Sequence, residues 1–242
     1  MKRLYFLSVL ILLGSQLPAH AQSGRELTEA RALYQQTNST AAAKLLRASL
    51  SQQANGFLGQ GLFQFGALRT YDGHYRRVPG LRYHAGLRLL EVQDSINTDS
   101  THLWPAGSLR GFDIGEAGDP DLPLRRFRTR LVKVGSEGTR REFVEVLTAI
   151  DAGPLLLAWL YSTGPETAPG RRPVVATLLA GSGTNGAEPL RLLEATQATV
   201  LRLFGGRANA VRTFAAAEHL DYTRPADIAR MMDYYNRVAV IK

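Results

Sequence analysis

The chain has 242 residues, of which 45% are hydrophobic, and it carries a formal net charge of +8 at pH 7. This length is enough for one large domain or two small ones with an apolar core that needs no covalent cross-links. The sequence contains no cysteine, which excludes disulfides, zinc-thiolate sites, thiol nucleophiles and a cysteine-borne lipid anchor.

The first 21 residues have the three parts of a secretory signal peptide. Lys2 and Arg3 provide the positive start, residues 4–13 are an apolar run, and residues 19–21 form a small-residue cleavage site. The apolar run is shorter than the roughly 20 residues of a transmembrane helix, and no later segment predicts one. We therefore expect cleavage after Ala21 and a mature, still basic chain that is periplasmic or secreted.

Two short helices are predicted after the signal peptide. Residues 26–36 and 40–50 have apolar side chains at helical spacing, and Ser39 or Thr40 is a suitable N-cap for the second helix. We assign residues 22–53 to a helical N-terminal segment.

The strongest strand signal lies in residues 141–161. A β-branched and aromatic run and a nearly continuous apolar run flank the turn sequence of residues 151–154, which is Asp-Ala-Gly-Pro. This pattern predicts a buried antiparallel hairpin. A buried helix is the alternative, but the shortness of each run and the Gly-Pro break count against it.

Further strands are predicted around this hairpin in a β domain of residues 54–194. They lie at residues 81–92, with a bend at Gly86, and at residues 108–114, 124–134, 173–180 and 189–194, while residues 56–66 lead from a loop into a strand. Residues 71–73 and 78–80 are predicted turns. About seven short strands at this spacing are typical of an antiparallel sheet, a sandwich or a small barrel.

The chain ends in helical patterns. Residues 196–204, 207–219 and 224–238 have apolar side chains at helical spacing, and Thr223 is the predicted N-cap of the last helix. We predict that residues 195–242 form a helical segment packed on the sheet. The predicted fold class is therefore α+β, with helices at both ends of a mainly antiparallel β domain.

The order of these pieces resembles a known kind of protein. The pieces are residues 78–83 (VPGLRY), 111–113 (GFD), 143–147 (FVEVL) and 227–236 (DIARMMDYYN). They are similar to an uncharacterised family of small exported Gram-negative proteins with a signal peptide, a β-rich middle and a C-terminal helix ending in Tyr-Tyr-Asn. The resemblance implies the architecture and the localisation, and no site residues. From the residues alone, Tyr235 lies on the apolar stripe, while Tyr234 and Asn236 are expected to close the helix C-terminus through local hydrogen bonds.

One glycine-rich motif matches the pattern of a dinucleotide fingerprint. Residues 181–186 read GSGTNG and follow a predicted strand. No acidic residue follows a second strand at the required distance, and Pro189 interrupts the start of the helix that the motif needs. A loop in a hairpin is the favoured interpretation, so no cofactor is predicted.

No catalytic or metal-binding constellation is predicted from spacing. The histidines lack the paired spacing of metal ligands, and the acidic loop with Glu116, Asp119 and Asp121 lacks the alternation of a calcium loop. Glu142 and Glu145 lie on opposite faces of a strand. For an exported hydrolase, which is the alternative function, the best candidates are His84, His102 and the loop of residues 113–121.

The densest basic cluster lies in residues 125–141. Strand alternation places Arg126, Arg128 and Arg130 on one face, which we expect to be solvated. Such a face is a candidate docking surface for an envelope protein, an anionic polymer or a lipid headgroup, and an arginine-coated surface without a partner is the alternative. Nucleic acid is not an expected partner outside the cytoplasm. The sequence thus favours an exported, non-catalytic binding or structural protein over an enzyme.

Overall fold

The structure is a computed structural model. It describes residues 29–34, 39–95, 101–135, 138–168, 172–184 and 186–240. The predicted signal peptide lies outside these residues. The chain divides into two compact units, Met1–Leu46 and Arg47–Lys242.

In the first unit, residues 29–34 are helical and helix α2 begins (Thr40–Gln52, continuing into the second unit). The hydroxyl of Ser39 accepts a hydrogen bond from the N–H of Ala42 at 3.4 Å. This bond satisfies one of the free N–H groups at the helix start, as predicted for a cap at this position. A short 3-10 helix, η1 (Ala54–Gly56), follows α2.

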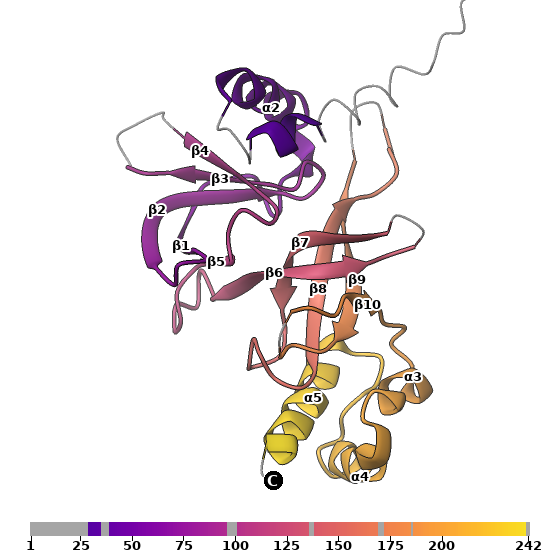
Figure 1. Cartoon of the computed structure of the whole chain (residues 1–242). Coiled ribbons are helices and arrows are strands. Elements are labelled where there is room, and N and C mark those ends of the chain that lie inside the picture. Colours follow the sequence, from indigo (N-terminus) through magenta and orange to yellow (C-terminus); the bar gives the residue numbers. More distant parts are fainter. Residues whose placement is uncertain are drawn as a thin grey trace, which may run out of the picture. The chain divides into compact units, whose positions relative to one another are not determined.

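Ten strands form the β-rich part of the second unit, three more than predicted (Figure 1). Their order in the sheet is β10-β9-β8-β7-β6-β5-β1-β2-β3-β4, and neighbours are antiparallel. Their bounds are β1 (Gln64–Arg69), β2 (Tyr75–His84), β3 (Leu89–Gln93), β4 (Thr101–Pro105), β5 (Gly111–Ile114), β6 (Arg125–Lys133), β7 (Thr139–Val146), β8 (Leu156–Thr163), β9 (Val174–Gly181) and β10 (Leu190–Leu192).

Strands β6 to β10 close into a five-stranded barrel. The closure is a parallel pairing, in which Leu190 and Arg191 of β10 lie beside Val132 and Lys133 of β6. The first half of β6 pairs instead with β5, so this strand belongs both to the barrel and to the sheet of β1 to β5. The predicted alternative of a small barrel is thus present, with five further strands beside it.

This double role buries both faces of β6. On one face, Phe127 stacks on Phe112 with ring centroids 4.5 Å apart, in a core that also contains Tyr83 and Phe143. On the other face, Val132 packs in the barrel core with residues of β7, β8 and β9. Successive side chains of a strand point to opposite faces, so the arginines at positions 126, 128 and 130 share the face of Val132.

The central hairpin is confirmed. β7 and β8 are antiparallel, with Val144 opposite Leu160 and Val146 opposite Ala158. These four side chains are buried in the barrel core.

The prediction of one strand over residues 81–92 is wrong. β2 ends at His84, a turn follows, and β3 runs back antiparallel to it from Leu89. Arg88 completes the turn with a left-handed backbone (φ 54°), which non-glycine side chains disfavour and which the sequence therefore concealed. The turn predicted at residues 78–80 is also wrong, because these residues lie inside β2.

Three C-terminal helices cover one face of the barrel, as predicted (Figure 1). They are α3 (Gln197–Arg202), α4 (Ala208–Ala217) and α5 (Pro225–Val240), with the 3-10 helix η2 (Gly205–Arg207) between the first two. Ile228, Met231 and Met232 of α5 are fully buried in a core that includes Leu157 of β8. Burial of this apolar stripe is what holds the helices on the barrel.

Two expectations about α5 are corrected. The hydroxyl of Thr223 donates to Asp221 at 2.7 Å and is not seen to cap the helix. Asn236 does not close the helix C-terminus, because it is buried and bonded to the backbone of Leu155, while Tyr234 stacks on Phe214 at 4.2 Å.

Candidate functional site

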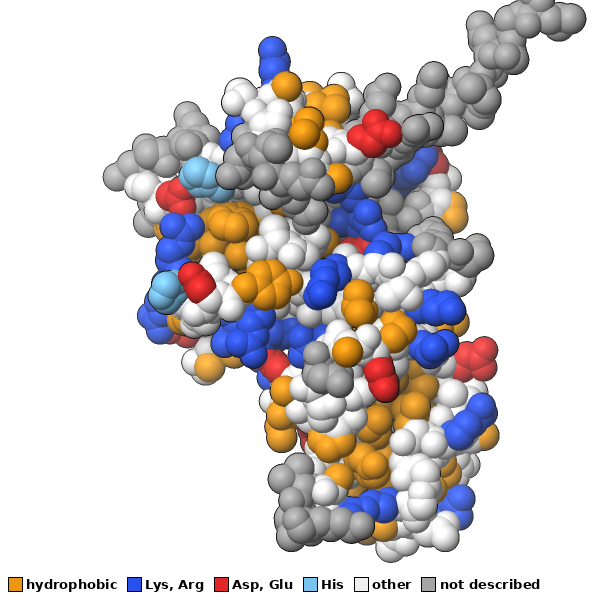
Figure 2. All heavy atoms as spheres, viewed as in Figure 1, with side chains coloured by type: hydrophobic (Ala, Val, Ile, Leu, Met, Phe, Trp, Pro, Cys, Tyr) orange, Lys and Arg blue, Asp and Glu red, His pale blue; other side chains and the backbone are white. Residues whose placement is uncertain are grey.

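The three arginines predicted to form a solvated face, Arg126, Arg128 and Arg130, are largely buried or half-buried. Arg128 has only 4% of its side chain exposed, and Arg126 has 24%. Figure 2 shows basic side chains spread over the visible face of the molecule, with acidic ones among them. The prediction that these arginines form a solvated face is therefore wrong, because this face of β6 points toward the barrel.

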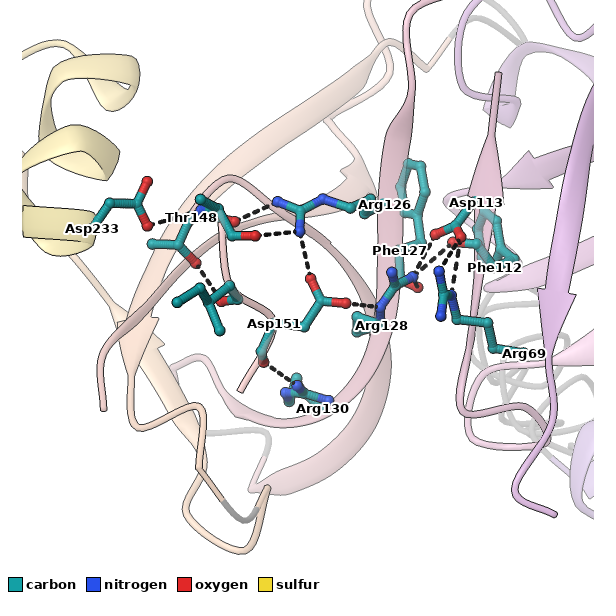
Figure 3. Close-up of polar contacts among 12 residues, drawn as sticks. Arg69, Phe112, Asp113, Arg126, Phe127, Arg128, Arg130, Thr148, Asp151 and Asp233 are labelled. Atoms are coloured by element: carbon teal, nitrogen blue, oxygen red, sulfur yellow. Dashed lines mark hydrogen bonds and ion pairs between the residues drawn. The ribbon is translucent and has the colours of Figure 1, made fainter. Parts of the chain in front are cut away.

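All three arginines converge on one residue, Asp151, in the connector between β7 and β8 (Figure 3). The Nη1 of Arg126 contacts its Oδ1 at 2.8 Å, and the Nε of Arg128 contacts its Oδ2. Arg130 donates from Nη2 to the main-chain oxygen of Asp151 at 2.6 Å. Arg126 also donates to the main-chain oxygens of Thr148 and Ala149.

The network continues toward β1 and β5. Arg128 Nη1 lies 2.6 Å from Oδ1 of Asp113, and Arg69 Nε donates to the other oxygen of the same carboxylate at 2.9 Å. Asp113 is buried. Buried charges are tolerated when they are paired and hydrogen-bonded in this way. The arrangement joins the barrel to the outer strands and leaves Arg128 committed to internal partners.

The residues considered for a hydrolase do not converge. His84 is fully buried, its Nδ1 accepts from the N–H of Leu87 at 3.0 Å, and its Nε2 lies 2.6 Å from the oxygen of Gln53. Burial lowers the pKa of His84, which fits a neutral ring that holds the β2–β3 turn. His102 pairs with Asp94 at 2.6 Å.

The acidic loop is held by its own backbone. Oδ1 of Asp119 accepts from the N–H groups of Asp121 and Leu122, and Glu116 pairs with Arg77 at 3.4 Å. Nowhere in the described part of the chain do three or more His, Asp or Glu side chains group so as to hold a metal ion.

The glycine-rich motif joins two antiparallel strands. β9 ends within it and β10 follows, with Arg191 opposite Ala180. A dinucleotide fingerprint requires a strand followed by a helix in a parallel sheet, so the topology excludes that interpretation.

A pocket of about 260 Å³ lies where the β2–β3 turn meets the ends of β7 and β8. The turn contributes Gly86 and Arg88, and the strands contribute the charged Glu142 and Arg140. The complete lining is Ala85, Gly86, Arg88, Arg140, Glu142, Leu160, Tyr161, Ser162 and Thr163.

Glu142 is the unusual residue of this pocket. Its side chain is fully buried, and Arg88 and Arg140 both contact its Oε1, the latter at 2.6 Å. Its Oε2 is buried without any hydrogen-bond partner. A buried carboxylate oxygen normally has a partner, and an orphan of this kind costs about 1–3 kcal/mol, or more because it is charged. Glu142 is therefore a lining residue of the pocket with an unsatisfied hydrogen-bond acceptor.

Tyr161, another lining residue of the pocket, is held by a second ion pair. Arg125 binds Glu145 through Nε and Nη2 at 2.8 and 2.7 Å, and the hydroxyl of Tyr161 donates to the same carboxylate at 2.5 Å. Burial and the adjacent carboxylate raise the pKa of Tyr161, so its hydroxyl keeps its proton and the ring stays in place.

Sequence reasoning missed Glu142 although one signal was present. The residue stands on the same face of β7 as Val144 and Val146, which are core residues. A carboxylate on the buried face of a strand predicts a paired or functional side chain, because Glu is almost never fully buried without a partner. The partner that completes the pocket, Arg88, lies 54 positions away, and no local pattern connects the two residues.

A second hollow lies between the β7–β8 connector and the helices, with a volume of about 420 Å³. Asp233 and Ile150 line it. The carboxylate of Asp233 already accepts from the N–H of Ala149 at 2.8 Å. None of the described residues that line this hollow has a buried side-chain atom without a hydrogen-bond partner, in contrast to Glu142.

No protein-family model, curated protein or solved structure matches this chain. Among the described residues, no helix combines the length and the apolar character that a membrane crossing requires.

Proposed function

We propose that this chain is an exported, non-catalytic binding protein whose ligand site is the pocket beside Glu142. The observation that carries the proposal is the buried, unpartnered Oε2 of Glu142, a residue that lines a cavity large enough for a small molecule. Ligand pockets combine an apolar lining with a few polar groups that fix orientation, and this pocket has both kinds of wall.

Binding suits the lining better than catalysis does. Among the described residues that line the pocket, Glu142 is the single carboxylate and none is a histidine. Acid–base hydrolysis needs two such groups at working distance from one substrate. Tyr161 is occupied by Glu145 and Arg125, so it does not supply a second proton-transfer group.

The proposed partner is an anionic component of the cell envelope. The mature chain remains basic after the loss of Lys2 and Arg3, which favours encounters with anionic polymers and headgroups. Arg126, Arg128 and Arg130 pair with Asp151 inside the protein, so the proposed contact is the pocket and not the face of β6.

A binding screen on the mature chain tests the site. Small acids, amines and sugars are added to the wild type and to the Glu142→Gln variant, which keeps the shape but removes the charge, and thermal unfolding is recorded. We expect at least one compound class to raise the Tm of the wild type and not that of the variant. Glu166→Gln, in an exposed ion pair with Arg172, is the matched control. Equal shifts in wild type and Glu142→Gln, or no shift with any compound, would refute the proposed site.

Export is tested separately. The full chain is expressed in a Gram-negative host, and the protein is isolated from periplasm, medium and cytoplasm. We expect the recovered chain to begin at Gln22 and to be absent from the cytoplasm. An intact chain that stays in the cytoplasm would contradict the proposed localisation without bearing on the pocket.

A further inference from the structure

We infer that the ligand of this pocket is a hydroxy acid, meaning a small molecule or chain end with a carboxylate next to a hydroxyl group. The inference rests on the proposed function of the same pocket and names the chemistry of its ligand. Two groups that belong to lining residues of the pocket, the Oε2 of Glu142 and one edge of Arg88, carry the argument.

The unpaired oxygen of Glu142 favours a hydroxyl group on the ligand. Its Oε2 is an acceptor only, so it needs a donor, and both a hydroxyl and an ammonium qualify. The other oxygen of the same carboxylate already has the guanidinium groups of Arg88 and Arg140 beside it. An ammonium would bring a third cation to one carboxylate, whereas a hydroxyl adds a hydrogen bond without charge repulsion. The arrangement therefore favours a hydroxyl.

The donor groups of Arg88 favour a carboxylate on the ligand. This residue uses Nη1 for Glu142, and its Nε and Nη2 make no hydrogen bond to the residues that the structure describes. These two N–H groups form the side edge of the guanidinium, which matches the two oxygens of a carboxylate. The protein uses the same edge elsewhere, where Arg125 binds Glu145 through Nε and Nη2.

The backbone around Arg88 is arranged to hold this side chain at the pocket. Its φ of 54° lies in the left-handed region, which disfavours an arginine by about 1–2 kcal/mol. Outliers of this kind persist where the surrounding structure enforces them, and they cluster at ligand sites. The same turn lies close to the end of β8, because a Cβ on Gly86 would lie 2.7 Å from Cγ2 of Thr163.

The remaining lining suits a sugar ring. Leu160 and Tyr161 supply carbon surface beside the polar groups. A cavity of about 260 Å³ accommodates a monosaccharide. A uronic acid, either free or at the end of a polysaccharide, carries the carboxylate, the hydroxyls and the ring.

Calorimetric titration of the mature chain with four probes tests the ligand class. D-Glucuronate has both the carboxylate and the hydroxyls, and D-glucuronamide lacks the charge. D-Glucosamine has no acid and carries an amine at C2, and methyl β-D-glucuronide imitates a chain end. We expect glucuronate or its methyl glycoside to bind at least about tenfold more tightly than the amide and the amine. Preference for the glycoside would indicate a polysaccharide end, and preference for free glucuronate would indicate a soluble acid.

Variants locate the binding. Arg88→Lys keeps the charge but removes the side edge, and we expect a loss of affinity of about tenfold or more for the acid. Glu142→Gln should lower the affinity for the acid by a similar factor. Arg172→Gln, which changes an exposed arginine, should leave this affinity unchanged. Each variant is first checked for a wild-type circular dichroism spectrum and cooperative unfolding.

The outcomes separate the ligand class from the proposed function. Tighter binding of glucosamine than of glucuronate, abolished by Glu142→Gln, would overturn the hydroxy-acid class and leave the pocket in place. Acid binding that is unchanged in both pocket variants would overturn the inference as well, because the ligand would then bind elsewhere. If none of the four probes binds while a compound that lacks either the carboxylate or the hydroxyl does so through Glu142, the class is again wrong. The proposed function itself fails only if no compound depends on Glu142.

Discussion

The side chain of Asn236 on α5 makes two hydrogen bonds with the backbone of Leu155, at the end of the β7–β8 connector. Its Oδ1 accepts from the N–H and its Nδ2 donates to the C=O, both at 2.8 Å. Asn236 is 1% exposed, so water cannot take over either bond. The C-terminal helix therefore fixes the point where β8 begins, in addition to covering the apolar face of the barrel.

Replacing Asn236 with alanine should destabilise the fold strongly. The variant removes both bonds and leaves the part-buried N–H and C=O of Leu155 without these partners, and an unsatisfied buried group costs about 1–3 kcal/mol. We expect a loss of about 2–4 kcal/mol in the free energy of unfolding, measured by urea denaturation with an unchanged m value. Asn209→Ala, at an exposed position of α4, should change stability by less than about 0.5 kcal/mol. Similar values for the two variants would show that the contact does not hold the connector.

Replacing Asp151 with asparagine should also destabilise the protein. The change removes the carboxylate that Arg126 and Arg128 share, and Arg128 is almost fully buried. Breaking a buried ion pair usually costs about 3–5 kcal/mol, and here Asp113 still faces Arg128, so we expect about 2 kcal/mol. Equilibrium unfolding gives the value.

The matched control for Asp151 is an ion pair on the surface. Glu166 and Arg172 are 3.5 Å apart and both well exposed, so Glu166→Gln should have almost no effect on stability. If Asp151→Asn behaved like this control, the arginine network of Figure 3 would be a set of surface contacts with little energetic role.

The sequence specifies the local elements of this fold but not the contacts between distant segments. The β7–β8 hairpin and the three C-terminal helices were predicted because their periods lie within single segments. Barrel closure was not specified, since it depends on Leu190 lying beside Val132, and no pattern within either strand records that pairing. The extra strands were missed partly because Arg88 adopts a turn conformation that is usual for glycine.

The same distinction explains the outcome for the candidate sites. Alternation correctly placed Arg126, Arg128 and Arg130 on one face of β6, because side-chain direction in a strand is local. The alternation does not predict whether that face is exposed to solvent, because exposure depends on the strands that pack against it. The pocket was not predictable for a related reason, because Arg88 and Glu142 come together only when the β2–β3 turn lies against the barrel.

The stability of the protein should depend on the ionisation of Asp233. Burial raises the pKa of this carboxyl above its ordinary value of 3.8, although the N–H of Ala149 and the charges of Arg237 and Arg126 act in the opposite direction. Arg230, Arg237 and Glu218 line the same hollow. The folded state thus binds the proton more readily than the unfolded state. As pH rises from 3.8 through the raised pKa, this carboxyl lowers the free energy of unfolding.

Asp233→Asn tests that sign. The amide oxygen still accepts from Ala149, but no buried charge is formed, so the variant should be more stable than the wild type at pH 7. The difference should shrink toward zero as pH falls below 3.8, where Asp233 is neutral in both states. Unfolding curves at pH 3 and pH 7 measure it, and Asp233→Ala, which also removes the acceptor, should be less stable than Asn at both values. A difference that grew at low pH would contradict the raised pKa.

Gly86 and Thr163 should be energetically coupled, because the β2–β3 turn presses on the end of β8. A Cβ at position 86 would lie 2.7 Å from Cγ2 and 3.1 Å from Oγ1 of Thr163, so Gly86→Ala should cost about 1–2 kcal/mol through overpacking. Thr163→Ala removes both of these atoms. In the double variant the alanine at position 86 should therefore cost less, with a coupling energy of about 1 kcal/mol. Gly206→Ala, where a Cβ meets open space, is the neutral control. Additive costs in this cycle would mean that the turn, and Arg88 with it, is not held against the barrel at the pocket.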